Sequence, residues 1–141
     1  MTFENLQNTQ GCNCLQGAVP DVDNSFYRKL KNEMASIDDF RTHFERRIGT
    51  DEQNCERLCS YKAVSINIRK AEYEALILDK YRTTFKFNPK KGAHCLVFRL
   101  RDESGLVKPT PEEDDESHYS FFKSDAFSLD HIDVVDTIKY A

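Results

Sequence analysis

The pattern of hydrophobic and polar positions is clearest in the second half of the chain. Apolar and polar side chains alternate over 64–68, which predicts a strand with one buried face. A weaker alternation runs over 118–123 through Tyr119 and Phe121. The continuous apolar run 94–100 predicts a buried central strand. Gly105 then opens a hairpin-like return over 106–108. Together these segments indicate a sheet whose strands are mostly antiparallel.

Earlier in the chain, apolar side chains recur at helical spacing instead. A four-residue spacing of apolar side chains over 26–34 predicts a short helix. Ser36 followed by Asp39 resembles a capping box with aspartate in place of glutamate. It predicts a second helix over about 37–47, which Gly49 would end.

Two further helices and one short strand complete the predicted elements. Asp51 would cap a third helix, on which Cys55 and Cys59 lie four residues apart and therefore on one face. Residues 71–82 return to helical spacing. Apolar and polar positions over 85–87 alternate again, which predicts a short strand before the next turn.

The chain has the length of one ordinary domain. Its 141 residues contain no Pro/Gly/Ser-rich stretch long enough to separate two domains. Residues 1–24 have no sustained period and predict an irregular N-terminal arm, followed by a single domain over 25–141. The last apolar segment, 132–138, fits a strand or a short helix. We therefore predict an α+β fold in which short N-terminal helices precede a mostly antiparallel sheet in one compact domain.

Composition and charge narrow the choice of partner. Ten Phe and six Tyr predict a core rich in aromatic side chains. The net charge is -4, and without the five acids of 112–116 it would be about +1, a balance that disfavours nucleic-acid binding. This acidic run lacks the ligand spacing and central glycine of an EF-hand, so we expect a solvated loop. Docking of a basic partner on it is the alternative.

The N-terminal sequence bears on the expected compartment. Residues 1–11 are polar and do not contain the basic and apolar regions of an ordinary signal peptide. Nowhere does the sequence reach roughly eighteen consecutive apolar residues, the length that a membrane span needs. We therefore expect a soluble cytoplasmic protein without a membrane partner, whose thiols stay reduced.

The cysteines form the clearest chemical constellation. Cys12 and Cys14 make one short pair, Cys55 and Cys59 make another, and His43 lies between the pairs. Thiolates and imidazoles are the usual ligands of tetrahedral zinc, and zinc would pin the arm to the helices. We therefore predict a structural Zn²⁺ site made by the four cysteines, or by three of them with His43. Plain buried thiols and a redox or disulfide role are the alternatives, because neither pair has the common C-x₂-C spacing.

A catalytic set is less evident. Cys95 as a nucleophile would need a base, and His94 is adjacent on the same strand and therefore faces the opposite side. His118 or His131 would have to reach Cys95 from another strand. Phosphate-binding glycine loops, the G-x-S-x-G elbow and the H-E-x-x-H pair do not occur in the sequence.

The sequence therefore predicts a small zinc-stabilised binding protein that acts through a protein partner. An enzyme is the less favoured class, because the cysteine pairs have no neighbouring base. Its form would be a thiol-dependent or metal-dependent hydrolase or transferase. The sequence predicts no oligomeric state.

Overall fold

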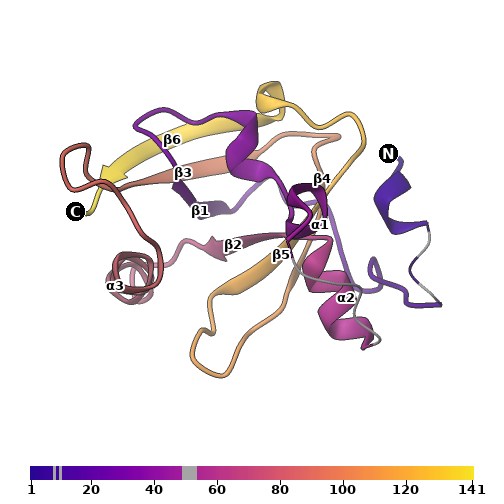
Figure 1. Cartoon of the computed structure of the whole chain (residues 1–141). Helices are drawn as coiled ribbons and strands as arrows, with labels where there is room; N and C mark the ends of the chain where they lie inside the picture. The colour runs from indigo at the N-terminus through magenta and orange to yellow at the C-terminus, as the bar shows by residue number, and fades with distance from the viewer. Residues whose placement is uncertain (8, 10, 49–53) are drawn as a thin grey trace.

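The computed structural model describes residues 1–7, 9, 11–48 and 54–141. These residues form a six-stranded antiparallel sheet in the order β4-β5-β2-β1-β3-β6 (Figure 1). The strands are β1 (Ser25–Leu30), β2 (Val64–Ile68), β3 (His94–Leu100), β4 (Gly105–Pro109), β5 (His118–Lys123) and β6 (Ile132–Lys139). The predicted fold class, α+β with an antiparallel sheet, is confirmed.

Six short helical segments accompany the sheet in the described part of the chain. They are η1 (Glu4–Leu6), η2 (Ile37–Phe40), α1 (His43–Arg46), α2 (Cys55–Tyr61), α3 (Glu74–Thr84) and η3 (Leu129–His131). Within the described ranges, no helix is long and apolar enough to cross a membrane.

The strands with the clearest sequence patterns lie where those patterns predict them. β2 and β5 coincide with the two alternating segments and pair with each other. β3 coincides with the apolar run and lies between β1 and β6, so both of its edges are paired. Side chains pack on both of its faces, and residues 95–98 are all buried. The last segment is a strand, β6, in which the register with β3 shifts and leaves Val135 as an extra, bulged residue.

The predicted helix over 26–34 is wrong, because its first half is strand β1. This strand pairs with β3 along its whole length and with β2 at its start. Phe26 and Leu30 are buried in one core cluster, while Tyr27 packs on the other face of the sheet. A four-residue spacing is a multiple of two as well as close to 3.6, so it puts side chains on one face of a strand as readily as of a helix.

Helix α3 covers one face of the sheet, where the sequence predicted a helix. Its buried Ile77 and Tyr81 pack against Tyr27 of β1 and against β3. The strand predicted over 85–87 does not form. Phe85 instead directly follows the helix, and the centre of its ring lies 5.9 Å from that of Tyr81. Its side chain therefore packs against α3.

Aromatic side chains fill the core on the opposite face. Phe26, Phe40, Phe98 and Phe121 are fully buried there. The rings of Phe40 and Phe98 meet edge to face with centroids 5.4 Å apart, an arrangement that aromatic pairs favour. Because Phe40 belongs to η2, this short helix closes the core over β3.

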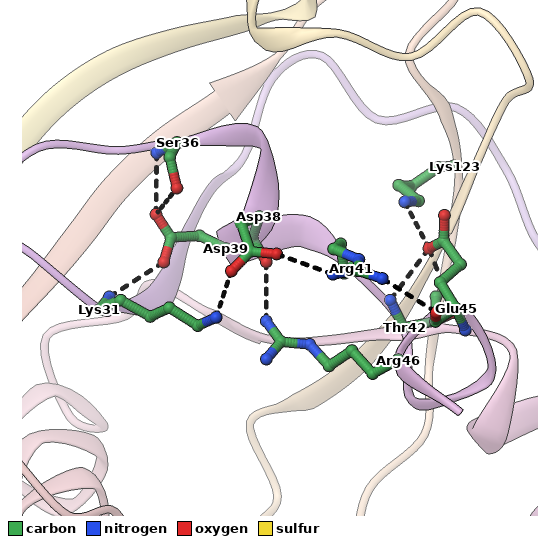
Figure 2. Close-up of polar contacts among 9 residues, drawn as sticks. All are labelled: Lys31, Ser36, Asp38, Asp39, Arg41, Thr42, Glu45, Arg46 and Lys123. Carbon is green, nitrogen blue, oxygen red and sulfur yellow. Dashed lines mark hydrogen bonds and ion pairs between the residues drawn. The ribbon is translucent and has the colours of Figure 1, made fainter. Parts of the chain in front are cut away.

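The helix predicted over 37–47 is divided into η2 and α1 by two extended residues, Arg41 and Thr42. Arg41 has φ -78° and ψ 137°, which ends the first turn. Ser36 and Asp39 form the capping box that their spacing predicted. The buried carboxylate of Asp39 accepts hydrogen bonds from the backbone N–H of Ser36 at 2.8 Å and of Lys31 at 2.9 Å, as Figure 2 shows.

Helix α1 has a capping box of its own, which ties it to the sheet. Thr42 is the N-cap, and its side chain accepts a hydrogen bond from the backbone N–H of Glu45. The Glu45 carboxylate also binds Lys123 of β5, with Oε1 and Nζ 2.6 Å apart (Figure 2). The predicted helix end at Gly49 and helix cap at Asp51 lie outside the described residues.

The N-terminal arm meets the outer edge of β4 at Val19. Val19 and Val107 exchange two backbone hydrogen bonds, of 2.9 and 2.8 Å. Lys108 of β4 donates from Nζ to the carbonyl oxygen of Cys14 at 2.8 Å. Cys14 is itself buried in a small apolar cluster with side chains of the sheet and of the arm. The arm therefore covers part of an edge that would otherwise expose unpaired backbone groups.

Candidate functional site

The two cysteine pairs are joined by disulfide bonds, so the predicted zinc site is wrong. Cys12 is bonded to Cys55 with Cα atoms 5.4 Å apart, and Cys14 to Cys59 with Cα atoms 5.2 Å apart. Zinc binds thiolates, and a sulfur atom in a disulfide is no longer one. Elsewhere in the described residues, no group of three or more His, Cys, Asp or Glu could hold a metal ion.

The two disulfides depend on the same helical spacing of Cys55 and Cys59 that suggested a metal chelate. One turn of α2 separates Cys55 from Cys59, so both sulfur atoms leave the same face of the helix. Two residues of the arm, Cys12 and Cys14, meet this face and fasten the arm to it at two points. The remaining candidate ligand, His43, is exposed at the first position of α1 and belongs to neither disulfide.

A cleft of about 780 Å³ opens between α2 and the hairpin formed by β4 and β5. Figure 1 shows α2 beside this hairpin. We call it the hairpin cleft; its lining residues include Asn13, Cys55, Arg57, Lys108, Thr110, Glu112, His118, Ser120 and Phe122. A volume of this size accommodates a small molecule or several side chains of a peptide.

A chain of hydrogen bonds crosses the wall of the hairpin cleft and centres on His118. The imidazole is buried, with 7% of the residue exposed. Its Nδ1 lies 2.9 Å from Thr110 Oγ1, and its Nε2 lies 3.2 Å from Glu112 Oε1. Ser120 Oγ lies 2.9 Å from the same Thr110 Oγ1. The result is a continuous series from hydroxyl through imidazole to carboxylate.

The register of the hairpin brings these side chains together. His118 and Ser120 are two residues apart on β5 and therefore share one face. Thr110 directly follows β4, and its backbone N–H donates to the carbonyl oxygen of His118 at 3.1 Å. Glu112 lies two residues further along, where its backbone pairs with Asp115 and turns the chain back toward β5.

Lys108 and Phe122 form the part of the cleft wall next to the arm. The Nζ atom of Lys108 lies 5.6 Å from the centre of the Phe122 ring. It also donates to the carbonyl oxygens of Cys14 and Gln16, so this cation is engaged by the arm. Phe122 is buried in the apolar cluster that contains Cys14 and Cys59, and it gives the cleft an apolar wall.

The loop 112–116 is not uniformly solvated, because Asp115 is buried. Its carboxylate accepts hydrogen bonds from Asn67 at 2.9 Å, Ser117 at 2.6 Å and Lys80 at 2.8 Å. Burial alone would raise the pKa of Asp115, but these hydrogen bonds outweigh it and lower the pKa. Asp115 therefore anchors the loop, while its other four acids are exposed.

A second hollow, of about 570 Å³, lies between this loop and α3. We call it the acidic hollow. Its lining combines apolar side chains of α3 with carboxylates of both elements: Tyr73, Leu76, Ile77, Asp79, Glu113, Asp114 and Glu116. Leu76 is 70% exposed there. Lys80, the cation in this hollow, is bound to Asp115.

The thiol chemistry considered from the sequence lacks an accessible nucleophile. Cys95 is fully buried in β3, and burial raises its pKa to about 12. Almost no thiolate forms at neutral pH with such a pKa. His131 contacts Ser128, whose backbone N–H donates to its Nδ1 at 3.0 Å. His118 contacts Thr110 and Glu112 instead of the thiol.

Comparisons with known proteins add nothing to this geometry, since no family model, curated protein or solved structure matches the chain. The functional interpretation below therefore starts from the side chains that line the hairpin cleft and the acidic hollow.

Sequence reasoning missed the hydroxyl, imidazole and carboxylate series. The alternation that predicted β5 already places His118 and Ser120 on one face. The missing information was the pairing of this strand with β4, which brings Thr110 and Glu112 to the same place. Gly105 and the return after it were the sequence signal for that hairpin.

Proposed function

We propose that the protein is a disulfide-stabilised binding protein that takes a basic segment of a partner protein into the acidic hollow. The observation that carries this proposal is the fixed position of the loop 112–116 beside an exposed apolar part of α3. As predicted from the sequence, the proposed partner is a protein. The stabilising element is the pair of disulfides and not the predicted zinc ion.

The anchor at Asp115 supports the proposal, because it gives the loop one shape before any partner arrives. Asn67 and Ser117 hold the Asp115 carboxylate in a buried network, and Lys80 joins it to α3. A loop held in this way loses little conformational freedom on binding, which favours affinity.

Charge and polarity suggest the chemistry of the bound segment. Glu113, Asp114 and Glu116 are exposed on the loop side of the hollow, and Asp79 lies on the helix side. Lysine or arginine side chains of a partner would complement these carboxylates. An apolar side chain between them would bury surface against Leu76. Nucleic acid is disfavoured because its phosphates would be repelled.

Binding of a synthetic peptide tests this proposal. The probe is a fluorescein-labelled peptide with three lysines around one leucine, and fluorescence anisotropy measures its Kd at low salt. The loop variant E113Q/D114N/E116Q should raise Kd about tenfold, since each exposed ion pair contributes roughly 0.2–1 kcal/mol. Binding by the native protein should also weaken as the salt concentration rises.

A matched control separates the hollow from the overall charge. The variant D23N/E33Q/D102N changes net charge by the same amount at exposed acids outside the hollow. It should leave Kd within about twofold of the native value, because distant surface charges are largely screened. Equal effects of the two variants, or no measurable binding by the native protein, would refute docking in the acidic hollow.

We also propose that the protein works in an oxidising compartment rather than in the cytoplasm predicted from the sequence. Disulfides persist in oxidising environments and are rare where glutathione keeps thiols reduced. Rapid alkylation of the protein in its native source, followed by mass spectrometry, tests this. Protection of Cys12, Cys14, Cys55 and Cys59 from alkylation after unfolding supports the proposal, while modification of all five cysteines contradicts it.

A further inference from the structure

We infer that the hairpin cleft is a catalytic site for hydrolysis of small carboxylic esters, in which Thr110 is the nucleophile. This inference goes beyond the proposed binding function and does not depend on it. Binding is proposed for the acidic hollow, whereas catalysis is inferred for the hairpin cleft. It rests on the mutual positions of Thr110, His118 and Glu112 in the wall of the cleft.

The three side chains have the geometry of a nucleophile, a base and an orienting carboxylate. A hydroxyl becomes a useful nucleophile when a base within about 2.6–3.2 Å can accept its proton. Thr110 Oγ1 lies 2.9 Å from Nδ1 of His118, within this range. On the far side of the ring, Nε2 lies 3.2 Å from the Glu112 carboxylate. Glu112 can therefore hold the proton on Nε2 and leave Nδ1 as the acceptor.

Two neighbouring oxygen atoms suit the proton transfer. The Ser120 hydroxyl, 2.9 Å from Thr110 Oγ1, can donate to it, which leaves the Thr110 proton directed at His118. The carbonyl oxygen of Thr110 lies 3.0 Å from Nδ1 of the imidazole. It can accept a hydrogen bond from Nδ1 once that atom is protonated, so the imidazolium that forms in the reaction has partners on both nitrogen atoms.

Burial holds the catalytic side chains in place, and the cleft lets a substrate reach them. His118 and Ser120 are buried, at 7% and 3% exposure, so their side chains have little freedom to move away. Thr110 is half-buried and lines the cleft, where a substrate can reach its hydroxyl. Phe122 offers an apolar wall for an acyl chain, and Asn13 brings an amide donor to the same cleft.

The reaction balances with water as the co-substrate. Thr110 Oγ1 forms a bond to the carbonyl carbon of the ester while its proton passes to Nδ1 of His118. The bond from that carbon to the alcohol oxygen then breaks, and His118 returns the proton to the departing alcohol. Water attacks the acylated Thr110 with His118 again accepting a proton, and the carboxylic acid leaves as Thr110 recovers its hydrogen.

Covalent labelling and ester hydrolysis test the inference on the full chain with its disulfides intact. An alkyl fluorophosphonate should modify Thr110, as located by peptide mass spectrometry. Hydrolysis of p-nitrophenyl butyrate should fall at least about 100-fold in T110V and in H118Q, the range expected for loss of a nucleophile or a general base. E112Q should lower the rate less and change its dependence on pH.

Two further variants control for misfolding and for nonspecific effects. T110S keeps the hydroxyl group and should retain hydrolysis, which distinguishes loss of chemistry from loss of fold. T83V makes the same substitution as T110V on the exposed side of α3 and should match the native rate within about twofold. A native protein that gives no adduct at Thr110, or a T110V variant as active as T110S, would overturn the inference. Neither result bears on peptide binding at the acidic hollow.

Discussion

Removing the first of the two disulfides should destabilise the protein less than removing the second one afterwards. The variants are C12A/C55A, C14A/C59A and the combination of both. The two bonds join the same two segments, so each of them alone keeps the arm attached to α2. Their contributions are therefore coupled, and the order of removal decides how large each loss appears.

The expected magnitudes follow from the lengths of the closed loops. The bonds span 43 and 45 residues, and closing a loop of that length stabilises the folded state by about 4 kcal/mol. With one bond in place, the other closes only a ring of about six residues, the intervals from Cys12 to Cys14 and from Cys55 to Cys59, which contributes about 2 kcal/mol. Either pair variant should lose about 2 kcal/mol, and the combination about 6.

Urea unfolding followed by circular dichroism measures these losses as free energies of unfolding. C12A/C55A is the cleaner single removal, because Cys55 is exposed whereas Cys14 is buried and leaves a small cavity when truncated. Thiol titration of each variant checks that the remaining disulfide has formed. If the combined variant loses no more than twice the loss of C12A/C55A, the coupling of the two loops is refuted.

Three further predictions concern the core and the loop. Cys95 should react with iodoacetamide only after unfolding, because it is buried with a pKa raised to about 12; rapid native-state labelling would contradict this. The lowered pKa of Asp115 stabilises the protein above about pH 4, and that contribution disappears as pH falls through the folded-state pKa. D115N should remove this part of the pH dependence in urea titrations, and an unchanged acid limb would contradict the assignment. G105A should destabilise the hairpin by several kcal/mol in the same assay, because φ is +151° and the added Cβ would lie 2.8 Å from the Phe121 ring; a loss below about 1 kcal/mol would contradict that estimate.

The sheet was predictable wherever its side chains alternate or form an apolar run. β2, β3 and β5 therefore lie where the sequence indicated. β1 was misassigned because Phe26 and Leu30 satisfy the helical and the strand period together. Pairing with β2 and β3 decides between these alternatives, and these pairings join residues about forty and about seventy positions apart.

The site was less predictable because it depends on contacts between distant segments. Spacing alone placed Cys55 and Cys59 on one helix face, but the same spacing suits a metal chelate, a buried face or two disulfides. The position of Cys12 and Cys14 against that face decides for two disulfides. The sequence alone does not reveal this position. The network of His118 likewise needs the register of the hairpin.

The arm's pairing with β4 has a consequence for self-association. Val19 occupies backbone groups at one end of the six-stranded sheet, and the disulfides hold it there. A reductant would loosen this cover and present β4 as a template on which a second copy could add a strand. At the opposite end, the bulge at Val135 already interrupts the regular edge of β6. We therefore expect reducing agents to promote aggregation of the protein, which light scattering before and after reduction would measure.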